Sequence, residues 1–145
     1  MAEPIIMSEI EEEPDRVISY RELWVMVNEF AALLKDFAGL KTGDRVTLHM
    51  PMVPELPVTM LALARLGVTH SQVFGGFSGP ACGDRIVDSE SHILITSDAY
   101  YRSGTLLDNK SKLTKRLNKQ KLGVWRLIKY SFGNVTPAKS HLPRK

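Results

Sequence analysis

The sequence predicts an α/β fold: a partial parallel sheet with crossover helices, in the order β-α-β-α-β, preceded by a β-hairpin and an amphipathic helix. Three observations lead to this prediction. Residues 43–77 contain two short β-rich segments separated by an apolar helical segment. A further β-rich run follows at His92–Thr96. The segments between these strands are long enough to hold helices, and strands that alternate with helices favour a parallel sheet.

Two β-compatible segments, Ile5–Ile10 and Arg16–Tyr20, stand at the start of the chain. The acidic segment 11–15 between them is too long for a tight turn, so the pair predicts a β-hairpin with a longer loop. Ser19 and Glu22 then have the Ser-x-x-Glu spacing of a capping box, which marks the start of a helix. Apolar residues at intervals of three and four predict one buried stripe along this helix. They are Leu23, Val27, Phe30, Leu33, Leu34 and Phe37.

The strand predicted at Val46–Met50 is followed by a proline-marked loop and an apolar helix. Proline is tolerated only in the first turn of a helix, so the three prolines between residues 51 and 57 confine the helix start to this region. From Leu56 to Leu66 the segment is apolar nearly all round, which predicts a buried helix. Gly67 supplies the C-terminal stop, and Val68–Phe74 forms the second strand.

A second crossover helix is predicted to begin at Ser78, with Ser78 as its N-cap and a proline in its first turn. The continuous β-rich run His92–Thr96 predicts a third strand that is buried on both faces. Residues 106–122 are compatible with a helix, and Gly123–Tyr130 could form a fourth strand. The polar remainder, Ser131–Lys145, has the composition of a disordered segment.

The length of 145 residues predicts one domain, and a hydrophobic content of 43% can fill its core. The net charge of +3 conceals a division along the chain. Residues 1–108 carry 16 Asp and Glu against 8 Lys and Arg, whereas residues 109–145 carry 11 Lys and Arg and no acidic residue. We therefore interpret residues 1–108 as the folded part and residues 109–145 as a basic, divergent C-terminal segment that is partly disordered.

Composition also bounds the cellular setting. No apolar run approaches the roughly 20 residues that a membrane helix needs, and the acidic first 15 residues lack a signal-peptide pattern. Cys82 is the single cysteine, so no internal disulfide can form and a reducing interior fits. These observations predict a cytoplasmic protein. The histidines share no metal-ligand spacing with one another or with Cys82, so no metal site is predicted, and His49 is expected to be a hydrogen-bonded structural histidine.

A ligand site is expected outside the carboxyl ends of the parallel strands. Gly75 and Gly76 have no side chains, so a ligand can approach the backbone there, and Arg102 offers a fork of donors suited to phosphate. From spacing alone, a turn-forming glycine pair and a solvated arginine are the more favoured interpretation. The segments that leave the strand ends are Pro51–Pro54, Phe74–Ser78 and Ser97–Thr105.

Several motifs resemble those of the AMP-forming acetyl-CoA synthetases, in the adenylate-forming enzyme superfamily. The central ones are Met50–Pro57, Ala64–Gly67 and Val73–Ser78, and the similarity extends over residues 17–107. The resemblance implies that the chain is an incomplete N-terminal domain of an adenylate-forming enzyme. The parent reaction would be activation of acetate by ATP to acetyl-AMP, followed by attack of the coenzyme A thiol.

In these synthetases a Phe-Gly-Gly-Phe-type turn and a Tyr-Arg-Gly-Gly-Lys/Arg-type loop contact coenzyme A. This chain departs from the second motif, because Ser103 replaces a glycine and Thr105 replaces a basic residue, which removes one charge-assisted contact. The resemblance implies coenzyme A contacts at Phe74, Gly75, Gly76, Arg102, Ser103, Gly104 and Thr105.

The resemblance assigns no catalytic residue, because the phosphate loop, the adenosine-binding motifs and the catalytic lysine of the family have no counterpart in these 145 residues. ATP and magnesium are therefore expected to bind only in the full-length family. Two classes of function remain open: a truncated acetyl-CoA synthetase without ligase activity of its own, and a non-enzymatic module that binds coenzyme A, a protein partner or nucleic acid. No fold-level signature supports nucleic acid. The expected partners are the remainder of the enzyme, or a second copy paired through the sheet edge at Gly123–Tyr130.

Overall fold

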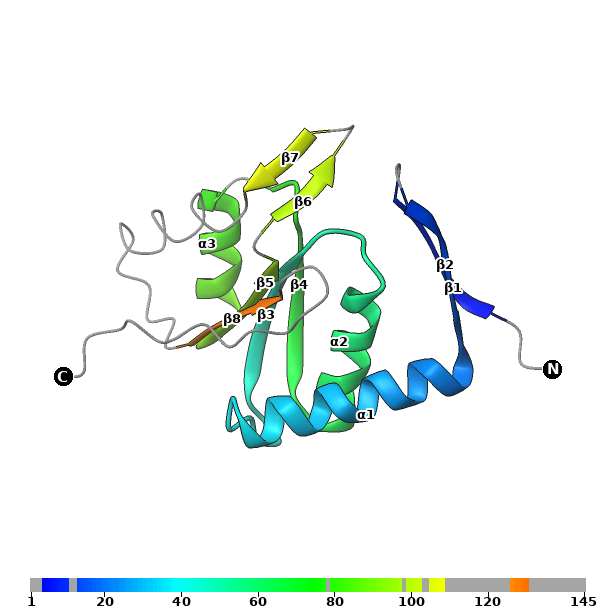
Figure 1. Ribbon diagram of the computed structural model, residues 1–145. Helices are drawn as coiled ribbons and strands as arrows, with labels where there is room; N and C mark the ends of the chain where they lie inside the picture. Colours follow the sequence, from blue (N-terminus) through cyan, green and yellow to red (C-terminus); the bar gives the residue numbers. More distant parts are fainter. Residues whose placement is uncertain are drawn as a thin grey trace. The chain divides into compact units, whose positions relative to one another are not determined.

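The computed structural model describes residues 4–10, 13–77, 79–97, 99–102, 105–108 and 126–130. The chain divides into two compact units, of which the first comprises residues 1–43 and 52–68 and the second residues 44–51 and 69–145. Helices alternate with parallel strands along the chain (Figure 1), which confirms the predicted α/β class.

The first unit opens with the predicted β-hairpin, in which β1 (Pro4–Ile10) pairs antiparallel with β2 (Glu13–Ser19). The expectation of a long acidic loop is wrong. Ile10 pairs directly with Glu13, so only two residues separate the paired strand ends. Pairing within the hairpin satisfies backbone N–H and C=O groups that a longer loop would leave to water. This gain outweighs the preference for a loop that the acidic, proline-containing segment 11–15 indicates.

The helix α1 (Tyr20–Asp36) begins at the predicted capping box. The backbone N–H of Glu22 donates to Ser19 Oγ at 3.3 Å, and the backbone N–H of Ser19 donates to Glu22 Oε2 at 2.8 Å. Leu34, which belongs to the predicted stripe, is fully buried, and α1 packs against α2 (Glu55–Arg65). Phe37 is instead 59% exposed, because it is the C-cap and lies beyond the last helical residue.

The helix α2 starts at Glu55 with Pro54 as its N-cap, in agreement with the constraint set by the prolines. The prediction that α2 is buried all round is wrong, since Leu61 is 46% exposed. Apolar composition shows which surface can be buried, but only neighbouring elements decide how much of it is covered. Gly67 follows the helix with a φ of 69°, a left-handed conformation that favours glycine as a helix stop. The buried residues of α2 are Leu56, Val58, Thr59, Ala62 and Leu63.

The second unit contains a parallel sheet with the strand order β4-β3-β5-β8 among the described residues, which confirms both the three central strands and the fourth. β3 and β5 are the inner strands of this sheet, and their residues are almost all buried, which confirms the burial predicted for the run His92–Thr96. β4 and β8 form its two edges. The strands are β3 (Arg45–Met50), β4 (Thr69–Phe74), β5 (Ile93–Ser97) and β8 (Arg126–Tyr130).

The helix α3 (Gly79–Asp88) connects β4 to β5 and covers part of the sheet core. Its residues Cys82 and Ile86 are one turn apart, and they form a buried cluster with Val73 of β4 and Leu94 of β5. Cys82 has no exposed surface, and burial raises the pKa of its thiol to about 11. The cysteine is therefore a packed core residue. The predicted N-cap, Ser78, lies outside the described residues.

The segment after β5 is a second hairpin rather than the expected loop. β6 (Ala99–Arg102) pairs antiparallel with β7 (Thr105–Asp108). The start of the helix-compatible segment 106–122 is therefore a strand, because pairing with the tyrosine-rich β6 outweighs a weak helical preference. Residues 109–122 and 131–145, for which a helix and disorder were expected, lie outside the described residues.

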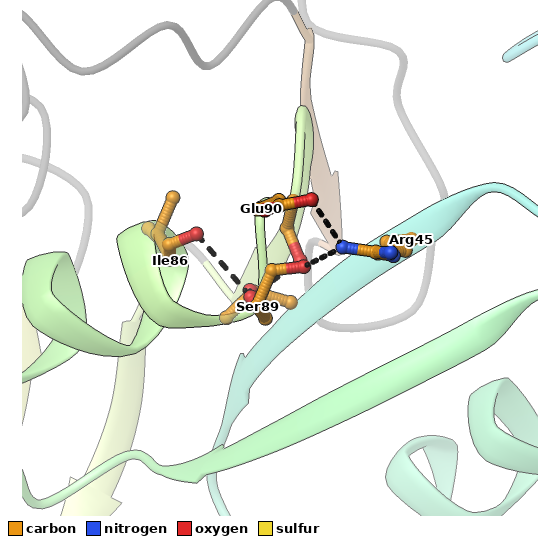
Figure 2. A network of polar contacts seen from close by, with 6 residues as sticks. Arg45, Ile86, Ser89 and Glu90 are labelled. Carbon is orange, nitrogen blue, oxygen red and sulfur yellow. Dashed lines mark hydrogen bonds and ion pairs between the residues drawn. The ribbon is translucent and has the colours of Figure 1, made fainter.

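A polar network joins the amino end of β3 to the turn after α3. The Arg45 guanidinium donates to Glu90 Oε2 at 2.5 Å and to the Ser89 carbonyl at 3.4 Å, and both contacts are drawn as dashed lines in Figure 2. Ser89 Oγ in turn donates to the Ile86 carbonyl at 3.3 Å and lies 3.3 Å from Thr47 Oγ1. Protein groups thus satisfy one another at this end of the sheet.

No helix in the described part of the chain is long and apolar enough to cross a membrane.

We expect the Cys82 thiol to react slowly with Ellman's reagent at pH 8 in the folded chain and about a hundredfold faster in guanidinium chloride. Thiolate is the reactive form, and burial makes it scarce by raising the pKa of Cys82 to about 11. The absorbance time course in both solvents checks this, with glutathione as the control for the effect of denaturant on the reagent. Equal rates in the two solvents would contradict the packing of α3 on the sheet.

Candidate functional site

The parallel register brings the carboxyl ends of the strands to one edge of the sheet. Met50, the last residue of β3, pairs with Phe74, the last residue of β4. On the other side of β3, His49 pairs with Thr96, and the next residue of β5, Ser97, pairs with Tyr130 at the end of β8. We call this the carboxyl edge. It is the position at which open parallel sheets bind ligands.

The chain leaves β4 at this edge through a tight turn, Phe74–Phe77. The Phe77 N–H donates to the Phe74 carbonyl at 2.9 Å, and the Gly75 N–H donates to the Met50 carbonyl at 3.2 Å. A Cβ atom at Gly75 would lie 3.1 Å from both Met50 O and Pro51 N. A glycine is thus needed at position 75 because the end of β3 lies so close to its backbone. The sequence instead led us to expect a glycine there so that a ligand could approach the backbone. Gly76 is exposed.

Two aromatic rings flank the glycine pair. Phe74 is 46% exposed and Phe77 is 56% exposed. Their ring centroids lie 6.4 Å apart with an interplanar angle of 86°, an edge-to-face arrangement. The motif resemblance implies Phe74 but not Phe77 as a site residue. The second phenylalanine of the same Phe-Gly-Gly-Phe motif was the signal that could have identified it.

His49 is a buried residue of β3, one position before the last residue of that strand. It is 1% exposed, and burial lowers its pKa from the ordinary value of 6.5. Hydrogen bonds to the backbone of Phe77 and to its own backbone oppose this shift. The Thr96 hydroxyl donates to the His49 carbonyl at 2.8 Å. His49 is therefore a buried histidine of the core, as expected of a structural rather than a catalytic histidine.

The other half of the expected site lies on the hairpin β6–β7. β6 starts two residues after Ser97, so the hairpin leaves the sheet at the carboxyl edge. Arg102 pairs with Thr105 at the closed end of this hairpin. Two β-compatible runs separated by Ser103 and Gly104 are the signal in the sequence from which this hairpin could have been predicted. The residues 103 and 104 themselves lie outside the described part of the chain.

The structure thus brings Phe74, Gly75, Gly76 and Phe77 together in one turn, and it places Arg102 and Thr105 opposite each other in a second element that leaves the same edge. Among the residues that the structure describes, no group of three or more His, Cys, Asp or Glu side chains could hold a metal ion. The carboxyl edge offers exposed aromatic surface and backbone groups, which suit a ligand with flat and apolar parts.

Comparison with known proteins agrees with this arrangement. The family described as AMP-binding enzyme matches residues 4–138, nearly the whole chain. The chain belongs to the AMP-binding enzyme family. The match reaches beyond the motifs at 17–107 at both ends, and it takes in the N-terminal hairpin and β8.

Members of this family with close sequence similarity are coenzyme A synthetases. The chain is 44% identical over 113 residues to a 3-hydroxypropionyl-coenzyme A synthetase from Sulfurisphaera tokodaii. The matched region covers 78% of this chain and 17% of the relative. It is 53% identical over 89 residues to an acetyl-coenzyme A synthetase from Wolinella succinogenes, covering 61% of this chain and 14% of the relative. The chain therefore spans about a sixth of the length of these relatives.

A solved structure shares the fold. Acetoacetyl-CoA synthetase from Streptomyces lividans superimposes with a TM-score of 0.80 at 25% sequence identity, covering 94% of this chain and 21% of the other. The similarity supports the assignment of the chain to the acetyl-CoA synthetase-like members of the family, in agreement with the motifs.

We expect Gly75→Ala to destabilise the chain by about 1–3 kcal/mol, as overpacking does. The added Cβ would lie 3.1 Å from backbone atoms of Met50 and Pro51, which cannot move as a flexible side chain can. Urea unfolding followed by circular dichroism measures the change, with Gly76→Ala at the exposed neighbouring position as the control. A Gly75→Ala variant as stable as the parent chain would show that the turn does not approach β3 this closely.

Proposed function

We propose that this acetyl-CoA synthetase-like chain contributes part of a coenzyme A binding surface and has no acetate–CoA ligase activity by itself. The surface lies at the carboxyl edge and is built from the turn after β4 and the closed end of the β6–β7 hairpin. Its proposed residues are Phe74, Gly75, Gly76, Arg102, Ser103, Gly104 and Thr105, and we add Phe77 because its exposed ring packs edge-to-face with that of Phe74.

The observation that carries the proposal is the exposed aromatic pair on the Phe74–Phe77 turn. Exposed large apolar side chains at a sheet edge suited to ligands are typical of a binding surface. Coenzyme A presents an adenine ring, an apolar pantetheine arm and phosphates, which match aromatic rings and an arginine in chemistry. The names of the similar proteins, acetyl-coenzyme A and 3-hydroxypropionyl-coenzyme A synthetase, favour the same ligand.

Two departures from the motif weaken the expected binding. Thr105 stands where the resembled loop has a basic residue, and Ser103 stands where it has a glycine. A charge-assisted hydrogen bond contributes about 1.5–3 kcal/mol, so loss of one cation would lower the affinity by at least about tenfold. The proposal is therefore one of weak binding.

We expect Arg102→Ala to lower coenzyme A affinity about tenfold, because one guanidinium contact to phosphate is lost. Isothermal titration calorimetry on the 145-residue chain measures it. Arg45→Ala is the matched control, since it removes the same charge at the amino end of β3, where Arg45 pairs with Glu90. Binding that is unchanged in Arg102→Ala, or equally weakened in Arg45→Ala, would place the anchor elsewhere.

We expect the chain alone to release no pyrophosphate from ATP in the presence of acetate. One support is that the chain covers only 14–17% of the length of these relatives. Another is that the run Arg102–Leu106 lacks the Pro-Lys-Gly ending of the phosphate loop in the resembled family. A coupled pyrophosphate assay measures this, with the Wolinella succinogenes synthetase as the positive control. Acetate-dependent release above background by the purified chain would refute the proposal.

A further inference from the structure

β4 is an edge strand of the parallel sheet, among the residues that the structure describes. It pairs with β3 over six consecutive residues, Thr69–Phe74, without a bulge. An edge strand presents backbone N–H and C=O groups to a further strand, and proteins protect such edges with charged side chains, prolines or bulges. β4 has none of these protections, since its sequence Thr-His-Ser-Gln-Val-Phe contains no Asp, Glu, Lys, Arg or Pro.

The other strands with an open edge in the described part of the chain all carry charge. β8, at the opposite edge of the same sheet, contains Arg126 and Lys129. The two hairpins have a charged residue in every strand. These are Glu9 in β1, Glu13 in β2, Arg102 in β6 and Asp108 in β7. Of the described edges, β4 is therefore the one best suited to pairing with another strand.

Two backbone hydrogen bonds show which residues of β4 are bound to β3. The Thr69 N–H donates to the Asp44 carbonyl at 2.9 Å, and the Gly75 N–H donates to the Met50 carbonyl at 3.2 Å. Both donors have odd numbers, and alternate residues of a strand bond to the same neighbour. The odd-numbered residues of β4 therefore bond to β3, and the even-numbered residues direct their N–H and C=O groups to the outer edge.

The even-numbered residues of β4 are His70, Gln72 and Phe74. The Phe74 carbonyl agrees with an outward direction, because it accepts from the Phe77 N–H at 2.9 Å. The three side chains lie on one face of the sheet, since side chains alternate along a strand. Gln72 is exposed and Phe74 is 46% exposed. Outward backbone groups and accessible side chains thus belong to the same residues.

We propose that β4 is a self-association surface, at which a second copy of the chain pairs antiparallel through its own β4. A two-fold axis perpendicular to the sheet keeps the same face of both copies on the same side, so the residues that lie opposite each other have numbers of the same parity. Only even-numbered residues offer outward backbone groups, and an axis through Gln72 pairs the whole strand. Gln72 then lies opposite the second copy's Gln72, and His70 lies opposite the second copy's Phe74.

The composition of β4 favours an identical strand as the occupant of this edge. Like charges that lie opposite each other destabilise a strand pair, and an uncharged strand meets its own copy without such repulsion. The Gln72 amides meet at the axis, where each can donate and accept. His70 beside Phe74 is an aromatic pair, which stabilises neighbouring strands. At β8, the same symmetry would bring two cationic strands together.

Sedimentation velocity over a concentration series, without coenzyme A, tests the proposal independently of the proposed function. We expect the parent chain to be in a monomer–dimer equilibrium. Both Gln72→Lys and Gln72→Glu are expected to raise its dissociation constant at least about fivefold, because like charges then face each other across the axis. These variants change the net charge in opposite directions, so a general charge effect cannot weaken both. An equimolar mixture of the two is expected to dimerise again, since opposite charges then meet.

Lys129→Glu is the control at the other edge of the sheet, and we expect it to leave the dimer intact. A parent chain that stays monomeric at the highest soluble concentration would overturn the proposal. So would a dimer that Gln72→Lys leaves unchanged, or one that Lys129→Glu disrupts, which would place the contact at β8. Mixed Gln72→Lys and Gln72→Glu chains that associate no better than each alone would show that these positions do not meet.

Hydrogen exchange of the parent chain tests the pairing without any variant. We expect the amides of Gln72 and Phe74, which face outward, to gain protection as the protein concentration rises. The amides of Ser71 and Val73, which face β3, are expected to be protected at every concentration. Outward amides that still exchange rapidly when the chain is dimeric would show that the two copies meet elsewhere, and the proposal would be overturned.

Discussion

The parallel register of β3 with β4 and β5 is the constraint on which the candidate site depends. It sets Met50 beside Phe74 and His49 beside Thr96, so that the segments leaving the strands start at one edge. A shift of one residue in the edge strand β4 would turn the buried Val73 away from its cluster with Cys82, Ile86 and Leu94. The burial of Val73 therefore also fixes the position of the turn that carries the aromatic pair.

The two ends of the sheet in the second unit differ in how their polar groups are satisfied. At the amino end, Arg45, Glu90 and Ser89 bond to one another, so this end is occupied by contacts within the protein. At the carboxyl edge, the turn presents the rings of Phe74 and Phe77 to solvent. Exposed apolar surface in such a position suits a bound ligand, and coenzyme A is the ligand that we propose.

The Phe-Gly-Gly-Phe motif combines two physical roles that the sequence alone does not separate. Gly75 allows the turn to lie against the backbone of β3, where a Cβ would be 3.1 Å from Met50 O. The phenylalanines on either side supply exposed surface. A motif that resembles a ligand-contacting loop can therefore owe part of its composition to packing, and substitution of each residue is expected to affect stability and binding to different degrees.

The sequence by itself determined the elements whose signals are local. The capping box at Ser19 predicted the start of α1, the prolines predicted the start of α2, and continuous β-rich runs predicted the inner strands, because each depends on residues a few positions apart. The motifs also identified the family and the turn at Phe74. Only the tertiary structure decided which apolar surfaces are covered, as the exposure of Phe37 shows. It also decided that the segment starting at residue 106, which is compatible with a helix, begins as a strand of the β6–β7 hairpin. It alone set His49 beside Thr96, because that pairing joins two strands far apart in the sequence and depends on their register rather than on spacing along the chain.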